Sequence, residues 1–109
     1  MPREDGLPPG TLIMLILRVL AQEPLHGYAI AQCIARASHD ELSVEEGSLY
    51  PALQKLLLKG WVTARPAVSE TGRQVREYRI TTSGRKQLDA ERARHVRLMQ
   101  AIAAVLDPA

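Results

Sequence analysis

The sequence predicts a mainly α-helical domain with one small β-hairpin. Between residues 11 and 60, apolar side chains recur three times at the three-to-four-residue spacing of a helix. Between residues 61 and 81 the apolar period changes to two, which is typical of strands. Helical spacing returns after residue 82 and continues almost to the end. The 109 residues, of which 46% are hydrophobic, suffice for one folded domain.

The first helix is predicted over Thr11–Gln22, after Gly10 and before Pro24, which cannot continue a helix. Its apolar residues cover nearly the whole circumference: Leu12, Ile13, Met14, Leu15, Ile16, Leu17, Val19 and Leu20. A helix that is apolar all round must be buried all round, and a domain this small rarely provides enough cover. We therefore expect a partner surface over one face of this helix.

Two further helices follow in the first half of the chain. One is predicted over His26–Ser38, and residues 40–42 form a short connector. The next begins between Val44 and Gly47 and ends at Gly60. Residues 43–46 fit a capping box, although Val44 could instead lie outside the helix as a hydrophobic staple. The core face of this third helix is formed by leucines: Leu49, Leu53, Leu56 and Leu57.

The second half contains the hairpin and a long helix. Strands are predicted over residues 61–64 and 75–81, with Tyr78 and Ile80 on one face and Gly72 at a positive φ in the loop. The last helix is predicted from Ser83 to about Leu106, with Thr82 as its cap. Its distal half carries an apolar stripe that nothing downstream covers: Leu98, Met99, Ile102, Val105 and Leu106. This stripe is the second indication of a dimer.

Charge is distributed unevenly along the chain. The formal net charge is +2, but residues 65–97 contain nine basic and four acidic side chains. Such a local excess suits a polyanionic partner, although a solvated basic surface would look the same. The element order of three helices and a hairpin is that of a winged helix-turn-helix. In that fold the third helix enters the DNA major groove and the hairpin, or wing, touches the backbone or the minor groove.

At this level of detail the residues resemble the PadR family of bacterial transcriptional regulators. The resemblance extends over residues 12–106. Its motifs are Leu-His-Gly-Tyr-Ala-Ile at 25–30, Glu-Gly-Ser-Leu-Tyr-Pro-Ala-Leu at 46–53, Gly-Trp-Val at 60–62 and Tyr-Arg-Ile-Thr-Thr-Ser-Gly-Arg at 78–85. It is similar to the short branch of the family, in which a winged helix, here residues 1–82, is followed by one dimerising helix, here residues 83–109. The resemblance implies a ligand-responsive repressor that binds a palindrome-like operator in double-stranded DNA as a homodimer.

The resemblance also implies roles for individual residues. Tyr50 would donate its hydroxyl to a phosphate, Gln54 would read an adenine edge, and Lys55 a guanine edge or a phosphate. His26 and Tyr28 would hold backbone phosphate at the start of the second helix. The full expected DNA-binding set comprises Ser48, Tyr50, Pro51, Gln54, Lys55, His26, Tyr28, Arg73, Gln74 and Arg76.

The chain departs from the family pattern at three places. Many relatives have a tryptophan in the first wing strand, where this sequence has Arg-Pro-Ala at 65–67. Many have paired aromatic residues in the second strand, where this sequence has Glu77 before Tyr78. Many short-branch members have a tryptophan near the position of His95.

Dimerisation and effector binding are expected to share the first and last helices. The expected dimerisation residues are Leu12, Ile16, Leu98, Met99, Ile102, Val105 and Leu106. A small hydrophobic or weakly anionic effector would contact Leu15, Val19, His95 and Met99.

Several other classes of protein are disfavoured. The three histidines and the carboxylates form no recognisable catalytic set, so no enzyme, metal or cofactor is expected. Cys33 cannot form an internal disulfide and is expected in the core. The polar, proline-rich residues 1–10 predict no secretory signal, and no apolar run could span a bilayer, so a cytoplasmic protein, nucleoid-associated when bound to its operator, is expected. The remaining alternative is a protein-interaction adaptor whose winged helix does not bind DNA.

Overall fold

The computed structural model describes residue 7 and residues 10–108. The parts of the domain prediction that fall on residues 1–6, 8–9 and 109 lie outside the described residues. The prediction that residues 1–10 form no secretory signal also falls mostly outside them. Three helices surround a core in the first half of the described chain: α1 (Thr11–Leu20), α2 (Gly27–Ala37) and α3 (Glu46–Leu58). A hairpin of β2 (Val62–Val68) and β3 (Gln74–Ile80) follows, and α4 (Thr82–Leu106) ends the fold. The mainly helical prediction with a small hairpin is confirmed.

A short third strand was not predicted. β1 (Leu25–His26) pairs antiparallel with β3, which gives a sheet in the order β1-β3-β2. Leu25 faces Tyr78 in the register and His26 faces Glu77. Two residues between Pro24 and a helix leave too short a pattern to show period two, so this pairing could not be predicted.

The core lies between the three helices and the sheet. Its fully buried side chains are Ile16, Leu17, Leu20, Ile30, Leu49, Leu53, Leu56 and Val62. Tyr78 and Ile80 join it from β3, as their common face predicted, at 4% and 7% exposure. Removing such apolar surface from water is the main force that holds the fold together.

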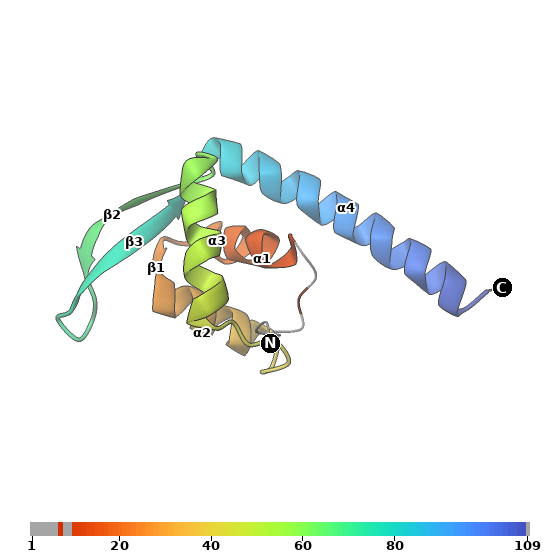
Figure 1. The fold of residues 1–109 in the computed structure, drawn as a ribbon, viewed down its shortest axis with the longest axis horizontal. Helices are drawn as coiled ribbons and strands as arrows, with labels where there is room; N and C mark the ends of the chain where they lie inside the picture. Colours follow the sequence, from red (N-terminus) through yellow and green to blue (C-terminus); the bar gives the residue numbers. More distant parts are fainter. Residues whose placement is uncertain (1–6, 8–9, 109) are drawn as a thin grey trace.

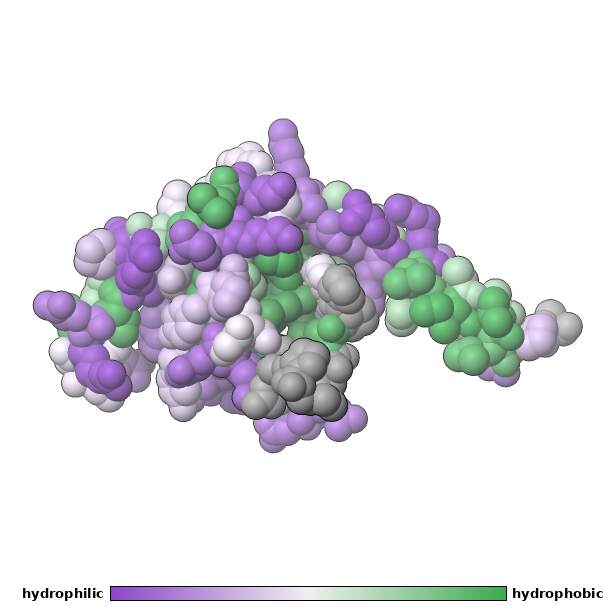
Figure 2. All heavy atoms as spheres, viewed as in Figure 1, coloured by the Kyte–Doolittle hydropathy of each residue, from purple (hydrophilic) through white to green (hydrophobic). Residues whose placement is uncertain are grey.

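The helix α4 extends away from this body, on the side opposite the hairpin (Figure 1). Only Gly84 and Leu88 are buried along its 25 residues. Figure 2 shows the resulting apolar surface on its distal half. The exposed residues there include the whole predicted stripe, from Ile102 at 41% to Val105 at 80% exposure. In α1, residues 11–15 and Val19 are only half-buried, so the complete burial expected of this helix is not reached within one chain.

Several helix ends differ from the predictions. The first helix ends at Leu20, not Gln22. The N-cap of the third helix is Glu45, whose side chain does not cap the helix, so the capping box beginning at Ser43 is wrong. The last helix is capped by Thr81, not Thr82, and Thr81 Oγ1 accepts a hydrogen bond from Gly84 N at 3.0 Å. Equivalent neighbouring hydroxyls made this last distinction invisible in the sequence.

Two features of the hairpin and second helix also differ. The first hairpin strand runs to Val68, well beyond the predicted Ala64, because Pro66 occupies an edge strand where its missing N–H does no harm. Cys33 is half-buried on α2, and the Arg36 guanidinium lies 3.8 Å from its sulfur, so its expected place in the core is wrong. Gly72 does adopt a positive φ, of 83°, in the loop.

Candidate nucleic-acid interface

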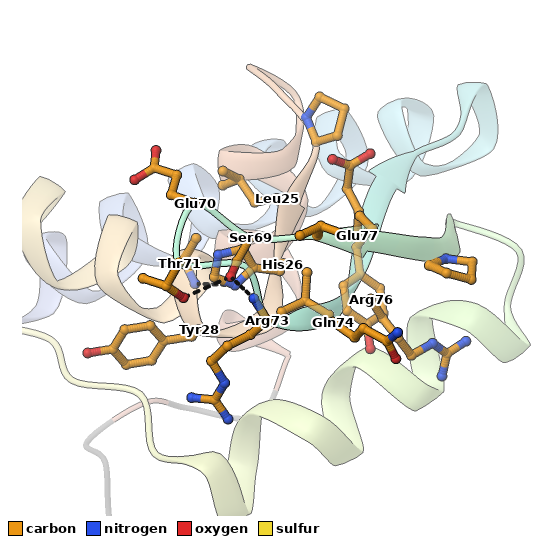
Figure 3. Close-up of a pocket in the computed structure, with 18 of the residues that line it drawn as sticks. Leu25, His26, Tyr28, Ser69, Glu70, Thr71, Arg73, Gln74, Arg76 and Glu77 are labelled. Atoms are coloured by element: carbon orange, nitrogen blue, oxygen red, sulfur yellow. Dashed lines mark hydrogen bonds between the residues drawn. The ribbon is translucent and has the colours of Figure 1, made fainter.

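A wide groove of about 1600 Å³ lies between the hairpin, the start of α2 and the exposed face of α3. We call residues 62–80 the wing. Seven of the ten expected DNA-binding residues line the groove: His26, Tyr28, Tyr50, Gln54, Arg73, Gln74 and Arg76. Figure 3 draws most of them, with the α2 and wing side chains arranged around one opening. Residues separated by up to 50 positions in the sequence therefore converge on one surface.

Local structure at the start of α2 fixes His26 and Tyr28. His26 is the N-cap of α2, and its Nδ1 accepts a hydrogen bond from Ala29 N at 3.4 Å. This contact uses one of the orphan N–H groups of the first turn. Tyr28 is 64% exposed and extends into solvent at the groove. The positive end of the helix dipole thus lies at the groove surface.

The exposed face of α3 contributes Tyr50 and Gln54. They are four residues apart and so lie on one side of the helix, while Leu49 and Leu53 are buried on the other. Tyr50 is 47% exposed. The end of its ring packs on Gly27: a Cβ built on this glycine would lie 3.0 Å from the Tyr50 hydroxyl oxygen. The same contact joins α2 to α3.

A network of hydrogen bonds orders the tip of the wing. Ser69 N donates to the Arg73 carbonyl at 2.8 Å, and Gly72 N donates to the Ser69 carbonyl at 2.9 Å. The Ser69 hydroxyl also accepts from Arg73 N at 3.2 Å and lies 3.1 Å from the Thr71 hydroxyl (Figure 3). The backbone of Arg73 is therefore held in place, while its side chain remains exposed.

Charges of both signs line the groove. Arg73 and Arg76 are basic, whereas Glu46, Glu70 and Glu77 are acidic. Glu77 is opposite Arg65 in the register, and the Arg65 guanidinium lies 3.0 Å from its carboxylate. The ion pair offsets the charge of this glutamate. The Arg76 guanidinium lies 6.0 Å from the centre of the buried Tyr78 ring, within range of a cation–π contact.

The remaining three expected residues do not line the groove. Pro51 and Lys55 are exposed on α3, and Ser48 is half-buried there. Conversely, Gln32, Glu46, Ser69 and Thr71 line the groove and were not predicted. Gln32 lies four residues after Tyr28 and Glu46 four residues before Tyr50, so helical spacing could have indicated both.

None of the four expected effector residues lines the groove. Leu15, Val19 and His95 are half-buried, and Met99 is 44% exposed on α4. In the described part of the chain, no three His, Cys, Asp or Glu side chains gather as metal ligands. Among the helices of residues 10–108, none is long and apolar enough to cross a membrane.

Three helices and a three-stranded antiparallel sheet with a projecting hairpin define a winged helix. Residues 16–90 match the model of the PadR-like family of transcriptional regulators. The chain belongs to this family.

Solved structures agree with the fold. A transcriptional regulator from Clostridium thermocellum superimposes with a TM-score of 0.82 at 23% identity, covering 90% of this chain and 95% of that one. A PadR family regulator from Eggerthella lenta gives a TM-score of 0.78 at 27% identity, covering 92% and 85%.

A longer sequence relative is also similar. A 37.1 kDa protein of transposon TN4556 from Streptomyces fradiae is 46% identical over 78 residues, which is 72% of this chain. The matched stretch spans 21% of that relative, about a fifth of its length.

Proposed function

We propose that this protein is a transcriptional repressor that binds an operator in double-stranded DNA through the groove and its rim. The observation that carries the proposal is the convergence of Tyr50, Gln54, Arg73 and Arg76 from α3 and the wing. Arginines and a tyrosine hydroxyl would donate to phosphates, which position a protein on DNA. Gln54 would read a base edge, with Lys55 beside it on the exposed face of α3.

The chain would act as a homodimer. The apolar side chains of α4 from Leu98 to Leu106 are between 41% and 80% exposed, which is costly for an isolated helix in water. The half-buried Leu12 of α1 would add to the same interface, whereas Ile16 is fully buried in the core of its own chain and would act only as support. A two-fold dimer carries two copies of the DNA-binding surface and would therefore suit a palindrome-like site.

In this proposal residues 1–82 form the DNA-binding part and residues 83–109 the dimerising helix. A small hydrophobic or weakly anionic effector would bind near Leu15, Val19, His95 and Met99 and alter DNA affinity. Such a protein would act in the cytoplasm, on the nucleoid when operator-bound. The effector part is tested by adding candidate compounds, and an unchanged melting temperature and DNA affinity would count against it.

The second candidate function is a protein-interaction adaptor without DNA binding. It is favoured by Glu46 and Glu70, which line the groove without a basic partner among the described side chains and would repel phosphate. A DNA-binding protein tolerates two such charges if its arginines lie closer to the backbone.

Binding to the protein's own promoter region discriminates between these functions. Fluorescence anisotropy with a labelled promoter fragment should show binding at low salt, and affinity should fall steeply as salt rises. Because an adaptor has no such affinity, failure to bind any genomic fragment at low salt would contradict the proposal. A reporter gene behind the same promoter should be less active when the protein is present, and increased activity would contradict the repressor role.

A further inference from the structure

We infer that Gly27 is a positioning residue for Tyr50, and that its missing side chain sets the location of the Tyr50 hydroxyl at the DNA interface. The inference rests on the proposed DNA-binding function and assigns a role to a residue that itself offers DNA no side chain.

The evidence is the close approach of two elements at one point. Gly27 is the first residue of α2 and is buried. A Cβ built there would lie 3.0 Å from Tyr50 Oη, 3.1 Å from Cε1 and 3.3 Å from Cζ. All three nearest atoms belong to the end of the Tyr50 ring, so this ring occupies the volume that a side chain at position 27 would need.

Backbone freedom does not explain this glycine. Gly10, Gly60 and Gly72 have positive φ values, but Gly27 does not, so its backbone conformation is open to alanine. Alanine is also the better helix former. Contact with Tyr50 is therefore the feature of the structure that favours glycine at this position.

A side chain at position 27 would affect the location of the Tyr50 hydroxyl more than the stability of the fold. A methyl group at position 27 would push the ring end away by a few tenths of an ångström, because contacts of 3.0–3.3 Å are tighter than almost all real contacts of a Cβ. Tyr50 is 47% exposed, so its ring can swing outward without opening the core. The same shift moves the hydroxyl and would lengthen the hydrogen bond that it is proposed to donate to a phosphate.

The test is a double-mutant cycle read by DNA affinity. Labelled promoter DNA is titrated with wild-type protein, Gly27→Ala, Tyr50→Ala and the double variant. Gly27→Ala should weaken binding by up to about tenfold, the value of one hydrogen bond to a charged group. In the Tyr50→Ala background the same change should alter affinity by less than about twofold, because the group it displaces is gone.

Two further measurements separate positioning from folding. The melting temperature of Gly27→Ala should equal or exceed that of the wild type. Tyr50→Phe removes the hydroxyl alone, and it should lose at least as much affinity as Gly27→Ala.

Four results would overturn the inference. They are unchanged affinity in Gly27→Ala, an equal loss in both backgrounds, a Gly27→Ala protein that does not fold, or unchanged affinity in Tyr50→Phe. Wild-type protein that binds no DNA would instead overturn the proposed function, and the inference with it.

Discussion

Gly84 packs directly against the backbone carbonyl of Trp61, so the first turn of α4 touches the chain just before β2. A Cβ at position 84 would overlap the Trp61 carbonyl oxygen and lie 2.8 Å from Ile80 Cγ1. Because a backbone carbonyl cannot rotate away as a side chain can, Gly84→Ala should lower the free energy of unfolding by about 1–3 kcal/mol. Urea denaturation measures this loss.

Gly47→Ala is the matched control for that measurement. Gly47 also lies in the first turn of a helix, but a Cβ built on it meets nothing within 4 Å. Its replacement should leave stability unchanged or slightly higher. Equal effects of the two substitutions would show that the Trp61 contact is not tight.

Thr81 is predicted to stabilise the start of α4 with its side chain. Its hydroxyl accepts from Gly84 N at 3.0 Å and donates to the Gly60 carbonyl at 2.8 Å. Thr81→Ala should therefore cost about 1–2 kcal/mol in thermal or urea unfolding. The adjacent Thr82 is exposed, so Thr82→Ala should cost less than about 0.5 kcal/mol. The reverse order would place the cap where the sequence alone suggested it.

Arg73 is predicted to contact one phosphate. Arg73→Ala should reduce the slope of log affinity against log salt by about 0.9, the contribution of one neutralised phosphate in duplex DNA. The measurement is a salt titration of promoter binding. Arg92, exposed on α4 and outside the groove, provides the control, because Arg92→Ala should leave the slope unchanged. A slope that both variants share with the wild type would exclude Arg73 from the interface.

The cross-strand pair of Arg65 and Glu77 is predicted to contribute little to stability. The Arg65 side chain is 67% exposed, so solvent screens the attraction. A double-mutant cycle with alanine at both positions should give a coupling energy of about 0.2–1 kcal/mol that decreases with salt. A coupling above about 2 kcal/mol would mean that the pair holds the wing together.

Ile102 is predicted to lie in the dimer interface. Ile102→Glu would bury a charge against apolar residues of a second chain, so the molar mass measured by light scattering should fall to that of a monomer. The control is Gln100→Glu, which introduces the same group on an exposed part of α4 outside the apolar stripe and should remain dimeric. A dimeric Ile102→Glu protein would show that the stripe is not the interface.

The helices and the hairpin were predictable because apolar residues recur regularly over long segments. In the third helix the buried face consists of leucines. The leucines at 49, 53 and 56 are indeed buried, and Tyr78 and Ile80 share the inward face of β3. Contacts between segments far apart in the sequence were harder to predict. β1 is two residues long and exists only through its pairing with β3, a contact that no local pattern encodes.

In the candidate site too, local spacing could be predicted from the sequence and long-range contacts could not. Helical spacing is enough to place Tyr50 and Gln54 on one face, but it could not show that Tyr50 packs on Gly27, which is 23 positions away. It also could not show that Arg65 pairs with Glu77, because the strand containing Arg65 was predicted to end at Ala64.

The junction at Thr81 has a mechanical consequence. No flexible linker separates β3 from α4, since Thr81 alone connects them. Thr81 also donates hydrogen bonds to the backbone carbonyls of Trp61 and Gly60. The 25 residues of α4 form a rigid rod about 37 Å long, which is attached to the fold at the base of the wing. A displacement of about 3 Å at its far end corresponds to a tilt of about 5° at this base. Small movements near Leu106 would thereby tilt the base of the wing and change the direction in which Arg73 projects.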